Sequence, residues 1–260
     1  MDSVLSSVDD GVCTIVLNRP EVRNSFTLPM IRQWEAVLRS CMTDDAIGAV
    51  VVTGAGDRAF CAGIDLSWLT DEHTPLERKN ELRDCIQRIA VTMDELDKPV
   101  LAAINGVAVG AGLDMALMCD IRIMSETARV SEGYVTLGLA PGNGGAYYLP
   151  RLVGISKALE LLLSGDFVDA EEALRIGLVN RVVPAERVLD DTIRFARAIA
   201  ANPPASVRMI KRLVKQSASI DLRTALDLAS SHVAVLATTE DVGEAVAALT
   251  QRRPGRYQGR

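Results

Sequence analysis

Three small residues in the middle of the chain, Gly110, Ala111 and Gly112, are the first candidates for chemistry. They follow an apolar run at 100–104 that predicts a buried strand, and they precede residues 113–118, which suit a buried helix. The first amides of a helix lack intrahelical partners and carry partial positive charge, and small side chains let a ligand approach them. The stretch therefore predicts either a site for a phosphate or a developing oxyanion, or close helix–strand packing with water on the amides.

A second turn of small residues, at 59–66, occupies a similar place in the pattern. It follows residues 49–53, another apolar run that predicts a buried strand. Both turns are therefore expected at the ends of strands, where backbone amides can be presented to a ligand.

Several other kinds of site lack their usual residues. The stretch from Gly110 to Met115 has methionine where a dinucleotide fingerprint needs its third glycine, and neither a P-loop nor a Gly-x-Ser-x-Gly motif occurs. The two histidines, His73 and His232, lie far apart, which disfavours a metal site or a histidine-based triad. The five cysteines have no CxxC spacing and are predicted to be reduced core residues.

The elements that must position the two turns alternate between strand and helix, which is the order of an α/β protein. Thr27 is expected to cap a helix with Pro29 in its first turn and Cys41 at the end of its apolar face. The polar residues 71–80 predict a mobile loop, and residues 138–154 are too rich in glycine and proline for a regular element. Strands are expected at 12–17, 49–53, 100–104, 121–124 and 128–135, and a further helix at 82–96.

The last part of the chain is predicted to be mainly helical. Asp169 and Glu172 form a plausible capping box, and Asn202-Pro203-Pro204 breaks the helical pattern. Helices are expected at 156–163, 171–176, 206–215, 220–237 and 240–252, with an extended piece at 178–183. We therefore divide the chain into a core, residues 1–200, and a helical tail, residues 201–260.

Composition favours a soluble globular protein. A chain of 260 residues with 48% hydrophobic content can bury one substantial core. The formal charge of −6 argues against nucleic acid or an anionic membrane surface as the main partner. No apolar run reaches the length of a membrane span, and the first eleven residues lack the features of a signal peptide, so we expect a cytoplasmic protein.

Six motifs recur in a fixed order along nearly the whole chain. They are Asn18-Arg-Pro, Ala59-Phe-Cys-Ala-Gly-Ile-Asp65-Leu, Ile104-Asn-Gly-Val-Ala-Val-Gly-Ala-Gly112, Met118-Cys-Asp120, Pro141-Gly-Asn-Gly-Gly145 and Ala173-Leu-Arg-Ile-Gly-Leu-Val-Asn180. Together they resemble the enoyl-CoA hydratase/isomerase family, the crotonases. The resemblance implies a spiral of ββα units with a C-terminal helical tail used in oligomerisation, in trimers or dimers of trimers. It also implies no cofactor, because CoA is part of the substrate.

The resemblance gives both turns one purpose. It implies that the backbone N–H groups of Ile64 and Ala111 hold the thioester oxygen of an acyl-CoA, where an enolate-like oxyanion forms. Removing one such donor typically costs ~10²–10³ in rate. The same oxyanion hole serves hydration, double-bond shifts, decarboxylation, dehalogenation or hydrolysis, so nearby side chains must select the reaction.

Asp114, Glu132 and Tyr134 are the acid/base candidates. Typical hydratases of the family use two glutamates, whereas this chain matches them with Asp114 and Tyr134 and has Glu132 two residues before Tyr134. On an extended segment, residues two apart face the same side, so Glu132 and Tyr134 could both face the site. The alternatives are a first-turn helix carboxylate for Asp114, a solvated strand position for Glu132 and core packing for Tyr134.

The resemblance also points to residues that contact the rest of the substrate. Arginine suits phosphate geometry, and solvated surface arginines are the alternative. The candidates for CoA phosphates are Arg23, Arg58, Arg252 and Arg253, from the same or a neighbouring subunit. The other substrate-contact candidates are Ala62, Asp65, Leu66, Trp68, Gly110 and Asn143, with Asn143 as an orienting hydrogen-bond group.

We expect an enoyl-CoA hydratase that adds water to a trans-2-enoyl-CoA, as in fatty-acid β-oxidation. An enoyl-CoA isomerase, or another family reaction that uses one carboxylate, is favoured instead if only Asp114 faces the acyl chain. A non-catalytic acyl-CoA-binding or assembly protein is the alternative suggested by the missing second glutamate. RNA binding, known for a few relatives, is disfavoured because the sequence has no evident basic track.

Overall fold

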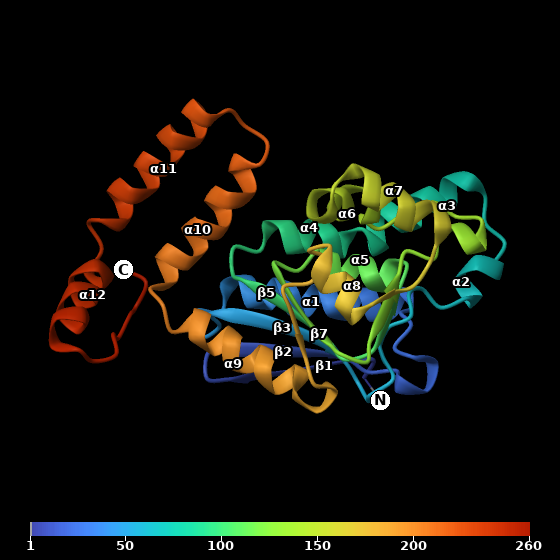
Figure 1. Ribbon diagram of the computed structural model, residues 1–260, viewed down its shortest axis with the longest axis horizontal. Helices are drawn as coiled ribbons and strands as arrows, with labels where there is room; N and C mark the ends of the chain where they lie inside the picture. The colour runs from blue at the N-terminus through green and yellow to red at the C-terminus, as the bar shows by residue number, and fades with distance from the viewer. Residues whose placement is uncertain (1) are drawn as a thin grey trace.

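Two β-sheets form the centre of the computed structural model, which describes residues 2–260 (Figure 1). The larger sheet has the order β1-β2-β3-β5-β7-β10, and its strands are parallel except for β1, which is antiparallel to β2. The smaller sheet has the order β4-β6-β8-β9, with only β9 antiparallel to its neighbour. The strands are β1 Val4–Asp9, β2 Val12–Leu17, β3 Ala49–Gly54, β4 Ala59–Cys61, β5 Val100–Ile104, β6 Val107–Val109, β7 Ile121–Ser125, β8 Arg129–Ser131, β9 Val168–Asp169 and β10 Arg181–Val183.

From β3 to β8, consecutive strands alternate between the two sheets. β3, β5 and β7 belong to the larger sheet, whereas β4, β6 and β8, which follow them directly, belong to the smaller one. A helical segment comes after each pair. This repeat confirms the expected α/β spiral of ββα units.

The larger sheet is covered on both faces. In β3, Val51 faces the helix α9 (Val188–Ala200), and Val50 and Val52 point into the main core on the opposite side. Strands buried on both faces in this way read as continuous apolar runs, which is why 49–53 and 100–104 were recognisable in the sequence. The helices are α1 Leu28–Thr43, α2 Ser67–Thr70, α3 Pro75–Glu81, α4 Arg88–Glu95, α5 Ala111–Leu117, α6 Gly145–Val153, α7 Ile155–Ser164, α8 Ala170–Arg175, α9 Val188–Ala200, α10 Pro204–Ser217, α11 Leu222–Leu236 and α12 Glu240–Gln251.

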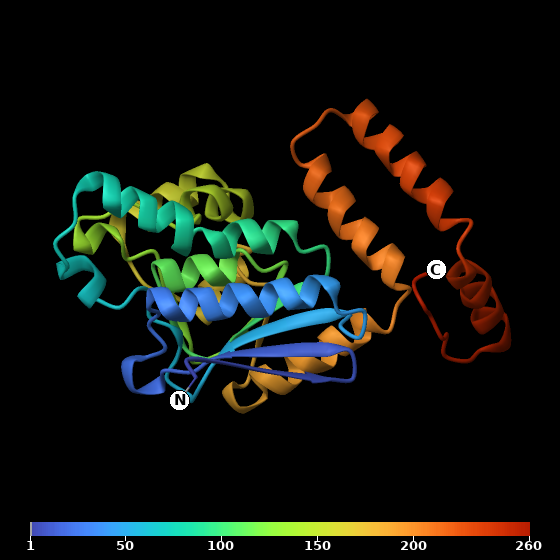
Figure 2. The ribbon, with the colours of Figure 1, turned by 180° about the vertical axis from the view of Figure 1, so that it is seen from behind.

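The last three helices stand away from the sheets, as Figure 1 and the reverse view in Figure 2 both show. Lys211 of α10 joins them to the body through Asp120, 2.6 Å away, and through the carbonyl of Lys98, 2.7 Å away. Large apolar side chains remain exposed there, including Leu222 at 72% and Leu249 at 82%. The expected tail helices are confirmed, and the division into a core and a tail stays a prediction.

Residues 71–80 were wrongly predicted as a loop, because they include α3. Thr74 caps this helix: its hydroxyl accepts from the Glu77 amide, and the Glu77 carboxylate accepts from the Thr74 amide at 2.8 Å. The Thr-Pro-x-Glu pattern of a capping box was therefore present in a stretch that polarity alone marked as irregular.

Two further predictions were wrong around residues 128–154. The strand expected at 128–135 ends at Ser131, and Tyr134 has helical backbone angles (φ −58°, ψ −41°). Helix α6 forms at 145–153 despite Pro150 within it, because Leu149 is fully buried against the core. Tertiary burial outweighed the local glycine and proline content in this segment.

Smaller departures occur elsewhere in the chain. β1 was not predicted, because Val4 is its only buried residue and an exposed edge strand gives little apolar alternation. The helix expected at 82–96 opens as a π-helical stretch, Leu82–Ile86, before α4. Asp169 caps α8 by accepting from the Glu172 amide, and Thr27 caps α1 as predicted. Among residues 2–260, no helix is long and apolar enough to cross a membrane.

Candidate active site

The two turns of small residues lie directly against each other. A Cβ on Gly112 would stand 2.1 Å from the carbonyl oxygen of Cys61, and a Cβ on Gly63 would stand 3.0 Å from that of Val109. Gly63 also has φ +95°, a backbone conformation that L side chains rarely adopt. Glycine at these two positions therefore lets the backbone of the first turn approach that of the second.

Each turn presents one amide without a partner. The backbone groups that flank the Ile64 N–H are paired with Phe26. The Phe26 N–H donates to the Gly63 carbonyl at 2.9 Å, and the Asp65 N–H donates to the Phe26 carbonyl at 2.9 Å. Neither the Ile64 N–H nor that of Ala111, the first residue of α5, donates to any group in the described part of the chain. Both residues line one pocket of ≈ 260 Å³.

The first turn is fastened by side chains. The carboxylate of Asp65 accepts from the Ser67 hydroxyl at 2.9 Å and pairs with Arg19 at 3.0 Å. These hydrogen bonds, first from Ser67 and then from Arg19, hold the pKa of Asp65 below its ordinary value. Asp65 thus points toward its own loop and does not line the pocket. The pocket therefore gives no support to the predicted contact between Asp65 and the substrate.

Asp114 and its neighbours form a buried acidic cluster behind the second turn. Asp114, on α5, is 0% exposed, and its Oδ2 accepts from the Tyr134 hydroxyl at 2.5 Å. Glu132, just after β8, is 1% exposed. A Cβ on Gly145, at the start of α6, would lie 2.4 Å from Asp114 Oδ1 and 2.9 Å from Glu132 Oε2, so both carboxyl groups converge on that glycine. Gly145 ends the motif Pro141-Gly-Asn-Gly-Gly145, but the approach of both carboxyl groups to this glycine was not predicted.

Burial separates the protonation states of the two acids. It raises the pKa of Asp114 to about 6, and the Tyr134 hydrogen bond opposes that rise. Burial, followed by the nearby charge of Asp114, raises the pKa of Glu132 to about 10. The pKa of Tyr134 is also raised, by burial and then by the charge of Asp114. At neutral pH the cluster therefore holds an ionised Asp114, a neutral Glu132 and a neutral Tyr134.

One polar side chain of the pocket remains without partners. Within residues 2–260, neither side-chain polar atom of Asn143 has a hydrogen-bond partner, whereas Glu132 and Asp114 share a side-chain hydrogen bond. Tyr134 and Asn143 line the pocket, whereas Asp114 and Glu132 do not. Because buried polar atoms are rarely left unpaired, the Asn143 amide is available to water or a ligand. Tyr134 is the link between the pocket and Asp114.

The prediction that Glu132 and Tyr134 lie on one face of a strand was wrong. The strand ends before Glu132, and the turn at Gly133 brings both side chains toward Asp114 from different directions. Gly110 lies beneath the Tyr134 ring, since a Cβ on it would stand 3.7 Å from that ring. The Gly110 N–H donates to the Ser131 carbonyl at 2.8 Å, which holds the second turn to β8.

The rest of the pocket wall is apolar except for Arg78, which comes from the segment wrongly predicted as a loop. Trp68 lines it as predicted, together with Arg78 of α3. Arg78 was missed, although the capping box of α3 could have placed it on a helix. The remaining lining residues are Phe26, Leu69, Leu82, Ile86, Leu139, Ala140 and Gly142.

The residues predicted to contact CoA fall into two groups. Those near the first turn include Ala62, whose amide donates to the Arg23 carbonyl at 3.0 Å, and Arg58, which donates to the Pro20 carbonyl at 2.8 Å. Leu66 is 63% exposed on the same segment. These positions are compatible with one bound molecule that extends out of the pocket.

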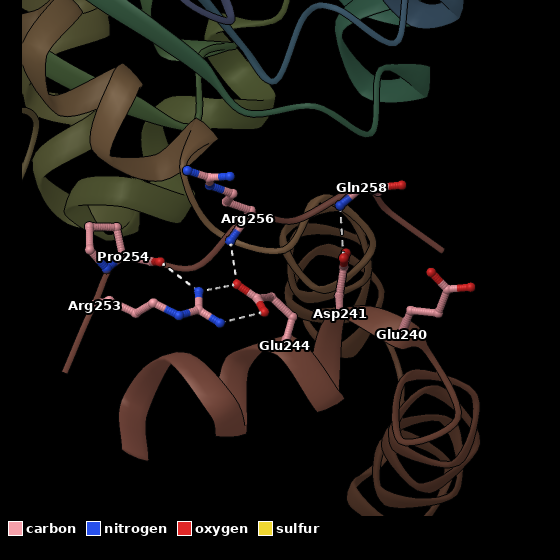
Figure 3. Close-up of a pocket in the computed structure, with 7 residues that line it drawn as sticks. All are labelled: Glu240, Asp241, Glu244, Arg253, Pro254, Arg256 and Gln258. Atoms are coloured by element: carbon pink, nitrogen blue, oxygen red, sulfur yellow. Dashed lines mark hydrogen bonds and ion pairs between the residues drawn. The ribbon is translucent and has the colours of Figure 1, made fainter. Parts of the chain in front are cut away.

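Arg252 and Arg253 belong to the second group. They directly follow α12, which stands away from the sheets and from α5 (Figures 1 and 2). Arg253 forms two hydrogen bonds to Glu244, of 2.5 and 2.9 Å, in an open hollow between α12 and the C-terminal segment (Figure 3). The structure of a single chain therefore does not bring these two arginines to the site. No cluster of three or more metal-ligand side chains occurs among residues 2–260.

Sequence and structure comparisons give a consistent result. The profile of the family described as Enoyl-CoA hydratase/isomerase matches residues 7–260. A short-chain-enoyl-CoA hydratase of Clostridium acetobutylicum is 34% identical over 253 residues, 97% of this chain and 96% of the relative. The 1,2-epoxyphenylacetyl-CoA isomerase of Escherichia coli is 35% identical over 265 residues, which cover 100% of both chains.

Solved structures agree with the sequence relatives. The enoyl-CoA hydratase of Bacillus anthracis has a TM-score of 0.93 and 33% identity, with 99% of this chain and 100% of that chain covered. Relatives with similar identity thus carry names for both hydration and isomerisation.

Proposed function

Because this chain belongs to the enoyl-CoA hydratase/isomerase family, we propose that it is an enoyl-CoA hydratase that adds water to a trans-2-enoyl-CoA. The observation that carries this proposal is Asn143. Its amide is 2% exposed, lines the pocket beside Tyr134 and has no partner for either polar atom in the described chain. An amide that can both donate and accept suits a water molecule, whereas the hydrocarbon part of an acyl chain would leave it unsatisfied.

The proposed reaction begins with the thioester oxygen on the Ile64 and Ala111 amides. Water held by Asn143 attacks the β-carbon, and the double-bond electrons move toward the thioester oxygen, where the two amides stabilise the negative charge. As the water oxygen bonds to carbon, its proton passes to the Tyr134 oxygen while the Tyr134 proton passes to Asp114. The proton then returns along the same path to the α-carbon, which restores Asp114 and completes the addition of one water.

Neutral Glu132 has a supporting part in this proposal. With a pKa of about 10, it adds no second negative charge beside Asp114 at neutral pH. It therefore leaves Asp114, with a pKa of about 6, ionised and able to receive the relayed proton. This arrangement replaces the two pocket-facing glutamates of typical hydratases with one tyrosine–aspartate relay.

The test is a spectrophotometric assay with crotonyl-CoA and a longer trans-2-enoyl-CoA, with product analysis by mass spectrometry. We expect loss of the conjugated-thioester absorbance and a 3-hydroxyacyl-CoA product. Tyr134→Phe, which keeps the ring but removes the relay hydroxyl, is expected to lower kcat at least ~10²-fold. Tyr147→Phe is the matched control because Tyr147 is 56% exposed and outside the pocket. Binding of acyl-CoA without any water addition would contradict the proposal.

Isomerisation is the second candidate, and a specific observation favours it. Tyr134 lines the pocket and donates to the Asp114 carboxylate, and a shift of the double bond needs only one such acid/base group. The isomerase among the relatives is consistent with this reaction class. Conversion of a 3-enoyl-CoA to the 2-enoyl-CoA, without hydration of the product, would select this candidate over the hydratase.

We further propose that the chain works without a cofactor, in the cytoplasm, and as a homo-oligomer, a trimer or dimer of trimers. The exposed apolar side chains on α10–α12 support contact between copies. The position of α12, which Arg252 and Arg253 directly follow, away from the body of the chain supports a role for these arginines at a neighbouring subunit's CoA phosphates. Light scattering coupled to size-exclusion chromatography tests the assembly.

A further inference from the structure

The segment from α2 to α3 forms one wall of the acyl pocket. Trp68 and Leu69 of α2 and Arg78 of α3 line the pocket on this side. Ile64 and Ala111, whose amides are free, line the same pocket. An acyl chain that starts at those amides therefore shares the pocket with Trp68, Leu69 and Arg78.

Glu81, the last residue of α3, holds this wall together. Its Oε2 accepts from the Trp68 indole N–H at 2.9 Å and lies 3.5 Å from an Arg78 guanidinium nitrogen. Its Oε1 lies 3.2 Å from His73 Nε2. Glu81 does not line the pocket itself, so its effect on a ligand must pass through Trp68 and Arg78.

Arg78 packs across the face of the Trp68 indole. Its guanidinium carbon lies 3.8 Å from the centre of the Trp68 ring, in the range of a cation–π contact, and its Nη2 donates to the Asp71 carbonyl at 3.0 Å. The Trp68 ring is thus fixed at its nitrogen and across its face. A wall held in this way resists displacement by a growing acyl chain.

The space inside this wall is small. A pocket of ≈ 260 Å³ accommodates roughly eight or nine non-hydrogen atoms if each takes about the 30 Å³ of a water molecule in the liquid. Its lining, apart from Tyr134, Asn143, Arg78 and the two amides, is hydrocarbon. This volume and lining suit a short or medium unbranched acyl chain.

We infer that Glu81 is a positioning residue that holds Trp68 and Arg78 as a fixed wall of the pocket, and that this wall limits the enzyme to acyl chains of up to about eight carbons. The inference deepens the proposed function, because it names the substrate class of the same site. It does not depend on whether the bound chain is hydrated or isomerised.

Binding of alkyl-CoA thioethers to the purified full-length protein tests the inference without any turnover. Butyl-, hexyl-, octyl-, decyl- and dodecyl-CoA would be compared by isothermal titration calorimetry. We expect the Kd to fall about fourfold per added methylene while the chain fits, and to stop falling or to rise beyond octyl-CoA. A Kd that kept falling through dodecyl-CoA in the unaltered protein would overturn the inference.

Three variants then locate the cause of the limit. Trp68→Ala removes the wall. Trp68→Phe keeps an aromatic ring but lacks the indole N–H, and Glu81→Ala removes the carboxylate that accepts from this N–H. All three are expected to improve dodecyl-CoA binding relative to butyl-CoA, by at least tenfold for Trp68→Ala and by less for the other two. Arg83→Ala is the matched control, since Arg83 lies two residues beyond Glu81 and, among residues 2–260, pairs only with the exposed Asp84.

The variants also separate a positioning role from a general loss of structure. If Glu81 acts through the indole N–H, Trp68→Phe and Glu81→Ala must shift the length limit alike. Glu81→Ala, which changes no lining residue, must also keep butyl-CoA binding within about threefold. An unchanged limit in both would refute the role of Glu81, and an unchanged limit in Trp68→Ala would refute the wall. Absence of enoyl-CoA turnover with this length limit intact would contradict the proposed hydratase reaction only.

Discussion

The two turns that present the free amides are held in place by different means. The turn at Ala111 begins helix α5, and its preceding residue is bonded to β8 through the Gly110 N–H. The turn at Ile64 is a loop whose position depends on distant segments, through the bridge to Phe26 and the pair between Arg19 and Asp65. One amide is thus placed mainly by its local element and the other by tertiary contacts.

The second turn also carries more of the chemistry. Asp114 lies one helical turn beyond Ala111, so a single short helix supplies both an amide and the acid/base group. The first turn supplies an amide and its supporting contacts only. Damage to the first turn should therefore weaken oxyanion stabilisation alone, whereas damage to the second should also affect proton transfer.

The largest effect is expected from Gly112→Ala, which forces the two turns apart. The new Cβ would lie 2.1 Å from the Cys61 carbonyl oxygen and 2.9 Å from the Gly63 nitrogen. Because both amides would be displaced, kcat is expected to fall at least ~10³-fold, with a stability loss of ~1–3 kcal/mol from overpacking. Turnover and thermal unfolding would be measured together.

Gly243→Ala is the control for this substitution. Gly243 lies in α12, and a Cβ there would meet no atom within 4 Å. The change should leave turnover unaltered and raise helix stability by up to ~1 kcal/mol. Nearly full activity in Gly112→Ala would show that the two turns need not touch for catalysis.

Asp114→Asn is expected to have the next largest effect, because it changes the second turn without moving its backbone. The amide side chain fills nearly the same space but accepts the relayed proton poorly, so turnover should fall at least ~10²-fold. Folding and acyl-CoA binding should remain close to those of the unaltered protein. Kinetics, thermal unfolding and calorimetric binding measure the three quantities, and undiminished turnover would remove Asp114 from the mechanism.

A pH profile of kcat/KM tests the same group in the unaltered protein. Asp114 must be ionised to accept a proton, and its pKa is about 6, so activity should fall about tenfold per unit as the pH drops below that value. Activity should be level above it and change again only near pH 10, where Glu132 ionises. These limits belong to the coupled pair as a whole. A profile without an acid limb near pH 6 would contradict the assignment of Asp114 as the base.

Asp65→Ala is expected to have the smallest effect, confined to the first turn. The substitution removes the contacts with Arg19 and Ser67 but keeps the backbone bridge to Phe26. We expect about a tenfold loss of kcat/KM, below the ~10² that a 1 Å misplacement can cost, and an unchanged acid limb. Asp84→Ala, which breaks an exposed ion pair outside the pocket, should have no effect. A shifted acid limb in Asp65→Ala would mean that the two turns are electrostatically coupled.

Much of the fold followed from local pattern. The strands at 12–17, 49–53 and 100–104 were predictable because strands buried on both faces or next to the core are continuously apolar. The long tail helices were predictable from their apolar spacing and from the break at Pro203 and Pro204. Helix α6 was not predictable in this way. It is stabilised by burial of Leu149 in the core, which its own glycine-rich sequence does not reveal.

The sequence by itself determined the chemistry available: small residues at both turns, a carboxyl group one helical turn after Ala111, and an asparagine and a tyrosine in the following segment. The tertiary structure decided which groups meet the pocket. Tyr134 and Asn143 line it, while Asp114 and Glu132 are buried behind it with separated pKa values of about 6 and about 10. The physical reason is that residue type and spacing are local, whereas desolvation and the approach of two charges depend on segments that only the fold brings together.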